Sequence, residues 1–98
     1  MEIVVSEDFS MTPAMQSALD AKMKKIHRIV GEDSLVRVYV SKEGKSGDCK
    51  VTFHVVLYQK EITATAVSND YYKAVNECKA KFLRQVTDAH NQVVQHHN

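Results

Sequence analysis

The sequence predicts an α/β two-layer sandwich, in which a four-stranded mixed sheet carries two helices on one face. Three observations lead to this fold: the element order is β-α-β-β-β-α, the strands alternate apolar and polar residues, and both helical segments have an apolar stripe. Such strands give a sheet with one apolar face, which two amphipathic helices can cover. A chain of 98 residues has room for one core. We therefore expect residues 1–98 to form a single domain.

The first strand is expected in "MEIVV", and a helix follows it. Thr12 and Pro13 signal the start of this helix, because threonine can cap it and proline lacks the N–H that is unpaired in a first turn. Gly31 signals its end, so we expect a helix over about Thr12–Val30. The helix crosses from the first strand to the second, so these strands should be parallel. The apolar stripe of the helix comprises Met15, Leu19, Met23, Ile26 and Val30.

Three further strands are expected, joined by turns. Leu35–Lys42 is rich in β-branched residues, and the loop Glu43–Asp48, with two glycines, leads into a strand over Cys49–Tyr58. A short turn at Gln59–Glu61 precedes the last strand, which begins at Ile62. The residues expected to share the inward register are Val38, Phe53 and Ala64.

The second helix should begin after Ser68–Asp70, a run of residues that favour the N-cap position. It includes "DYYKAVNECKAKFLRQV" and extends to about Val94. Its apolar stripe comprises Tyr71, Val75, Cys78, Phe82, Val86, Ala89 and Val93.

The net charge of +1 hides an uneven layout of charges. Residues 1–20 hold four acids and no base, whereas Ala21–Arg28 holds four cations and no acid. A near-neutral chain can therefore carry a local positive field, which is what a polyanion senses.

Counting about 100° per residue places most of these cations away from the apolar stripes. Lys24 and Arg28 lie on the outer side of the first helix, and Lys81 and Arg84 on the outer half of the second. Lys79 lies beside its stripe, where its stem can be buried while its ammonium reaches water. If both helices cover one face of the sheet, the cations form one surface. That surface is either an ordinary solvated face or a site for a polyanion.

The whole chain resembles the short form of the ribosome hibernation promoting factor family, which includes the ribosome-associated inhibitor and carries the sigma-54 modulation label. The resemblance rests on "AKMKKI", "SNDYYKAV" and "KFLRQVTDAH", in this order and spacing. The family's fold is similar to that of double-stranded RNA-binding domains. Long-form members add a C-terminal dimerisation domain, which we do not expect here, so the short promoting branch is the nearer match.

The resemblance implies a protein that binds the small ribosomal subunit and its ribosomal RNA in the mRNA and tRNA channel. It would compete with tRNA and mRNA, block translation and preserve inactive ribosomes in stationary phase. The positions that match the family's RNA-binding residues are Lys22, Lys25, Lys81 and Arg84. Geometry alone adds Lys24, Arg28 and Lys79. The sequence departs from the family after Arg84, where "DAHNQVVQHHN" has no lysine or arginine.

Other classes of function are weaker or remain open. The histidines lack metal-ligand spacing, and there is neither a phosphate-binding glycine loop nor an activated nucleophile, so we expect no enzyme, cofactor or metal site. No apolar run is long enough for a membrane span, and the two separated cysteines suit a reducing compartment, so we expect a cytoplasmic protein. We also expect it to be monomeric when free. One alternative is a single-stranded RNA module that uses Tyr39, His54 and Tyr58 on its sheet. Another is a protein-interaction module that modulates a transcription factor.

Overall fold

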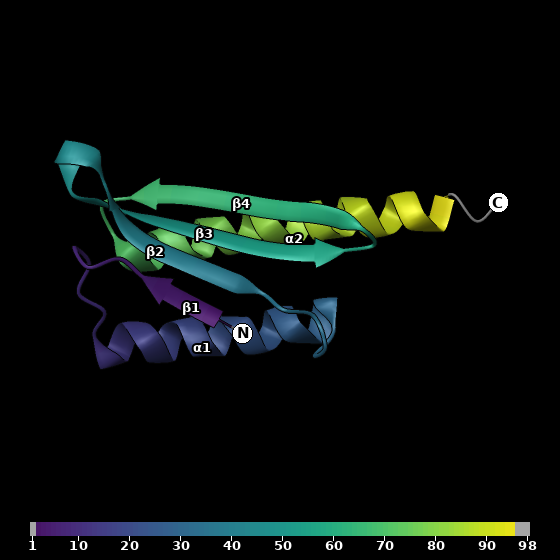
Figure 1. Cartoon of the computed structure of the whole chain (residues 1–98), viewed down its shortest axis with the longest axis horizontal. Coiled ribbons are helices and arrows are strands. Elements are labelled where there is room, and N and C mark those ends of the chain that lie inside the picture. Colours follow the sequence, from purple (N-terminus) through teal and green to yellow (C-terminus); the bar gives the residue numbers. More distant parts are fainter. Residues whose placement is uncertain (1, 96–98) are drawn as a thin grey trace.

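A computed structural model describes residues 2–95, with side chains described as far as residue 92. The elements are β1 (Glu2–Val5), α1 (Pro13–Val30), β2 (Arg37–Glu43), the 3₁₀ turn η1 (Gly44–Ser46), β3 (Asp48–Leu57), β4 (Lys60–Ser68) and α2 (Tyr71–Gln95). Their order confirms the predicted β-α-β-β-β-α succession (Figure 1).

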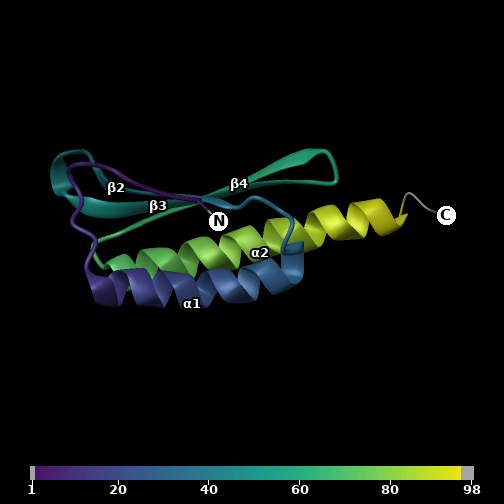
Figure 2. The same ribbon diagram turned by 60° about the horizontal axis from the view of Figure 1, so that its bottom comes forward.

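The four strands form one mixed sheet in the order β1-β2-β3-β4. The pair β1–β2 is parallel, as the helical crossover predicted, and the two later pairs are antiparallel. Both helices lie on the same side of the sheet, side by side, and run in the same direction (Figures 1 and 2). The predicted two-layer sandwich is thereby confirmed.

The core lies between the sheet and the two helices. Val38 is paired with Phe53, and Phe53 with Ala64, so the predicted inward register is confirmed. The rings of Phe53 and Phe82 meet edge to face with centroids 5.8 Å apart, and both side chains are fully buried. The predicted stripe of α2 is buried from Tyr71 to Ala89. The side chain of Val93 lies outside the described residues.

Local signals fix the helix ends as expected. The Thr12 hydroxyl accepts a hydrogen bond from the Met15 N–H at 3.2 Å, which caps α1. At the other end Gly31 has a φ of 99°, a conformation that side chains oppose, and its N–H donates to the His27 carbonyl. The Asp70 carboxylate accepts from the Tyr72 N–H at 2.9 Å at the start of α2.

The turn between β3 and β4 differs from the expected Gln59–Glu61. The chain turns at Tyr58 and Gln59, whose φ values are 53° and 63°, and β4 already begins at Lys60. Two left-handed residues in succession give a hairpin turn whose twist matches that of the strands. Neither residue is glycine, asparagine or aspartate, so the usual sequence signal for this turn was missing.

Candidate RNA-binding surface on the two helices

The relative position of the helices is fixed at their N-terminal ends. The Tyr71 hydroxyl donates a hydrogen bond to the Met15 carbonyl at 3.1 Å, and the Tyr71 ring also meets Phe9 with centroids 5.8 Å apart. Because α1 and α2 advance in parallel from this contact, residues equally far from it lie at similar heights. By this measure Lys22 lies at a height similar to that of Lys79, and Arg28 at a height similar to that of Arg84.

Three lysines lie close enough for their charges to interact where the two helices adjoin, and we call this region the lysine seam: Lys22, Lys25 and Lys79. Lys22 and Lys79 are half-buried, and Lys25 is exposed. Burial lowers the pKa of Lys79, and the charges of Lys22 and Lys25 lower it further. Burial disfavours a charged ammonium and like charges repel it, so an anion bound here would relieve both effects. The structure thus brings together one lysine of the second helix with two of the first.

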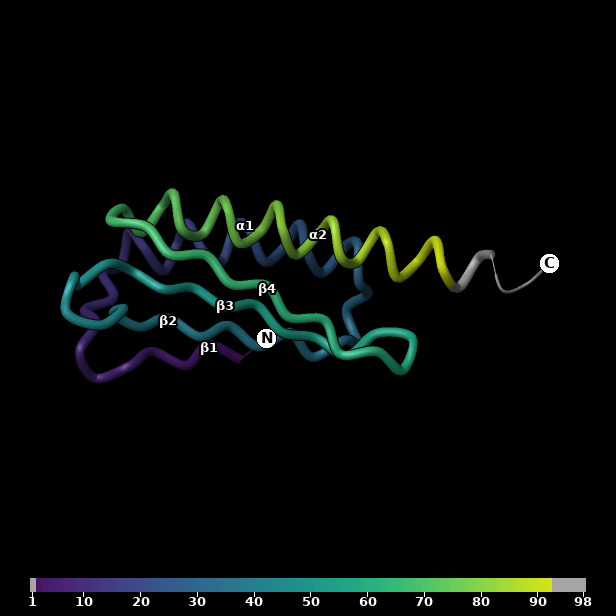
Figure 3. Tube along the Cα trace, turned by 90° about the horizontal axis from the view of Figure 1, so that it is seen from above, coloured from purple at the N-terminus to yellow at the C-terminus, as the bar shows by residue number. Residues whose placement is uncertain are grey.

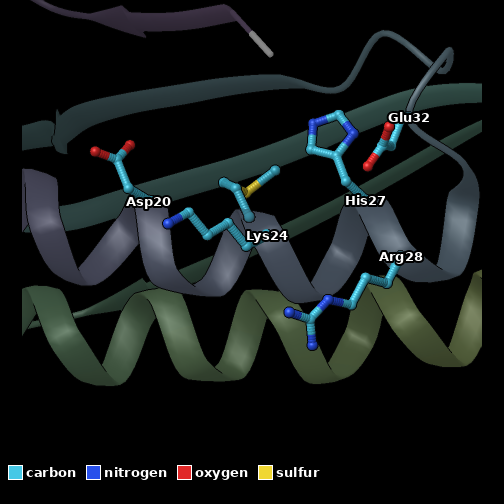
Figure 4. Close-up of a pocket in the computed structure, with 6 residues that line it drawn as sticks. Asp20, Lys24, His27, Arg28 and Glu32 are labelled. Atoms are coloured by element: carbon cyan, nitrogen blue, oxygen red, sulfur yellow. The ribbon is translucent and has the colours of Figure 1, made fainter.

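The two arginines extend this positive region towards the C-terminal ends of the helices. Arg28 and Arg84 are both exposed. In Figure 4, Arg28 extends from α1 to the side on which α2 lies, whereas His27 extends to the opposite side. An arginine can hold a phosphate with two parallel hydrogen bonds, so this pair suits an RNA backbone.

Lys24 stands apart from the seam, on the other flank of α1. It helps to line a hollow of about 640 Å³. Acids and cations mix there, so Lys24 shares its surroundings with two carboxylates (Figure 4). The lining residues are Asp20, Met23, Lys24, His27, Arg28 and Glu32. This mixture makes a weaker field for a polyanion than the lysine seam. Arg28 also borders the hollow, but its guanidinium extends towards α2.

Lys81 is exposed, as expected, but it is directed to the sheet. Its ammonium donates to the Thr65 carbonyl of β4 at 3.2 Å. Gln85, one turn further along α2, donates in the same way to the Thr63 carbonyl at 2.9 Å. Gln85 was not among the predicted site residues. Its spacing of four from Lys81 was the available signal, because residues so spaced share a helix flank.

The open face of the sheet offers a poorer site for RNA. His54 pairs with Glu61 at 2.8 Å, and Arg37 lies 3.9 Å from Glu2. Lys50 on the same face lies 3.7 Å from Glu43, so each of these three basic groups has a carboxylate beside it. Tyr58 sits in the turn, where its hydroxyl is 3.2 Å from Nδ1 of His90 on α2. Tyr39, His54 and Tyr58, the residues of the alternative single-stranded RNA site, therefore do not form one continuous surface.

Within the part of the chain that the structure describes, no group of three or more histidine, cysteine or acidic side chains is placed to hold a metal ion. None of the described helices has the length and apolar character needed to cross a membrane.

Comparison with known proteins decides the family. A family described as "Sigma 54 modulation protein / S30EA ribosomal protein" matches residues 3–93. The chain belongs to this family. Membership confirms the resemblance read from the two helices, and it associates the chain with the ribosome. No curated protein matches the sequence.

Solved structures share the fold of this family member. The N-terminal domain of Protein Y from Thermus thermophilus matches with a TM-score of 0.69 and 16% identity, over 87% of this chain and 91% of that one. A ribosomal subunit interface protein from Coxiella burnetii matches with a TM-score of 0.73 and 22% identity, over 93% and 99% of the two chains. At such identities the likeness concerns the fold.

Proposed function

We propose that this protein is a ribosome hibernation factor, which binds the small ribosomal subunit in the mRNA and tRNA channel. Bound there, it excludes tRNA and mRNA, blocks translation and preserves inactive ribosomes in stationary phase. The protein acts in the cytoplasm as a single domain, monomeric when free, and needs neither a cofactor nor a catalytic group. Family membership and the ribosomal subunit interface protein among the similar folds support the ribosome as its partner.

The observation that carries the proposal is the lysine seam with its two flanking arginines. The pKa of Lys79 is lowered partly by Lys22 and Lys25, so these ammonium groups repel one another in the free protein. A phosphate placed among them converts repulsion into attraction. Five cations, namely Lys22, Lys25, Lys79, Arg28 and Arg84, form the centre of the proposed RNA site. Lys24 and Lys81, on the outer flanks of the two helices, form its margins.

Salt dependence tests whether phosphates are the ligand. Each neutralised phosphate contributes roughly 0.7–0.9 to the slope of log affinity against log salt, so five contacts give a slope of about 4. Binding to purified small subunits should therefore weaken by roughly two to three powers of ten between about 50 and 200 mM salt. Competition with initiator tRNA, measured in the same assay, tests the position on the subunit.

Charge reversal tests whether a located surface is responsible. Lys25→Glu combined with Arg84→Glu should abolish binding, because it places two carboxylates within the proposed site. Lys42→Glu combined with Lys45→Glu changes the net charge equally, at exposed positions in β2 and η1, and should weaken binding much less. Equal losses from both pairs would show that net charge governs binding, and absent competition with tRNA would place the protein elsewhere.

A further inference from the structure

The outer edge of β4 is covered by side chains from α2. The Lys81 ammonium donates to the Thr65 carbonyl at 3.2 Å, and the Gln85 side-chain amide donates to the Thr63 carbonyl at 2.9 Å. Near the start of the strand, the Lys60 ammonium donates to the side-chain oxygen of Gln92. Figure 3 shows β4 alongside α2, with β1 at the opposite edge of the sheet.

An edge strand of this length is a pairing surface unless something covers it. Unpaired N–H and C=O groups along an edge can accept a strand from another chain, and natural proteins prevent this with short edges, charged side chains or a covering element. The edge strand β1 has 4 residues, whereas β4 has 9. The short length of β1 protects one edge, and side chains of α2 protect the edge at β4.

The two covered carbonyls are among the groups that a further strand would need. In an antiparallel sheet the N–H and C=O of one residue point to the same side. The carbonyls of Thr63 and Thr65 point outward to α2 side chains, so the N–H groups of these residues also point outward. A strand added at this edge would bond to both threonines, and it would have to displace Lys81 and Gln85.

A second β4 fits this edge. An antiparallel pair centred on Ala64 aligns all of β4 with its copy and sets Thr63 opposite Thr65 of the second copy. In that register Glu61 faces Val67 and Lys60 faces Ser68, so no like charges meet. The hydroxyls of Thr52 and Thr65 already lie 3.1 Å apart across β3 and β4, and the new threonine pairs would continue this row.

We propose that β4 is a latent self-association edge, and that Lys81 and Gln85 keep it closed. The two side chains are edge guards: each occupies a carbonyl that a second copy would otherwise bond. This role concerns the free protein and does not rest on the proposed function. Lys81 is also a marginal member of the proposed RNA site, so the Thr65 carbonyl and an RNA phosphate compete for one ammonium.

The test removes both guards and measures association without RNA. Lys81→Ala combined with Gln85→Ala should convert the monomer into a dimer in sedimentation-velocity runs over a concentration series. Each lost guard bond is expected to tighten dimerisation by up to about tenfold, since a net hydrogen bond corresponds to roughly that factor. The matched control is Lys73→Ala combined with Asn76→Ala, which removes the same chemical groups from exposed positions of α2 and should stay monomeric.

Amide hydrogen exchange locates the interface. The N–H groups of Thr63 and Thr65 should exchange more slowly in the double variant as its concentration rises, because they then bond to the second copy. A double variant that keeps its circular dichroism spectrum but remains monomeric would overturn the proposal. Association without slower exchange at these two amides would also overturn it. Neither measurement uses ribosomes, so failure here is distinguishable from failure of the proposed function.

Discussion

Replacing Lys79 with glutamine should strengthen the fold and weaken RNA binding at the same time. In the free protein Lys79 is half-buried, and both burial and the charges of Lys22 and Lys25 lower its pKa. Glutamine has a similar length and no charge, so it removes the repulsion and keeps most of the packing. Like-charged neighbours on a helical surface cost roughly 0.2–0.5 kcal/mol each, so two of them amount to about 0.5–1 kcal/mol.

The melting temperature measures the change in stability. For a domain of this size 1 kcal/mol shifts the melting temperature by roughly 4–8 °C, so Lys79→Gln should melt about 2–8 °C higher than the wild type at neutral pH. Lys73→Gln is the control on the same helix, because Lys73 is exposed and such substitutions usually change stability by no more than about 0.5 kcal/mol. Binding to small subunits should become weaker. The slope of log affinity against log salt should fall by roughly 0.7–0.9, because one phosphate contact is lost.

The pH dependence gives a second readout of the same residue. Because the pKa of Lys79 is lower in the folded protein than its ordinary 10.5, the unfolded state binds more protons in the window just below 10.5. Stability contributed by this group therefore rises with pH through that window. The stability advantage of Lys79→Gln over the wild type should shrink towards pH 10.5. The reasoning would be refuted if Lys79→Gln were less stable than the wild type, or if its log affinity for ribosomes kept an unchanged slope against log salt.

Two further outcomes concern the core. Burial raises the pKa of both Tyr71 and Cys78 to about 12, from 10.0 and 9.0, so the folded protein keeps protons that the unfolded chain loses. The free energy of unfolding in urea should consequently fall as pH rises above 9, and a flat alkaline profile would contradict this. Phe82→Ala should cost about 3–5 kcal/mol in the same urea titration, because it empties the site that Phe82 fills against Phe53. A loss of unfolding free energy smaller than that of a surface substitution would contradict this prediction, because it would mean that the core collapses to fill the cavity.

The strand and helix pattern could be read from local spacing alone. Alternation in the strands predicted the inward register of Val38, Phe53 and Ala64, because a period of two fixes which face each side chain takes. Thr12 and Gly31 marked the ends of α1, since capping depends on residues within one turn. Family membership was likewise recognisable in the order of the helix motifs. The turn at Tyr58 and Gln59 was not, since it contains no glycine and its tertiary contact, between Tyr58 and His90 of α2, is distant in sequence.

The candidate site depended on tertiary structure in a way that spacing could not supply. The sequence by itself determined which residues leave the apolar stripe of each helix, and hence that seven cations are candidates for one surface. It did not determine what lies on either flank of a helix. The two helices lie in parallel on one face of the sheet, joined by the hydrogen bond between Tyr71 and Met15, and this arrangement brings Lys79 to Lys22 and Lys25. The position of β4 beside α2 turns Lys81 towards the Thr65 carbonyl instead. The direction in which a side chain leaves its helix is a local property. The groups that this side chain then faces depend on contacts between distant parts of the chain.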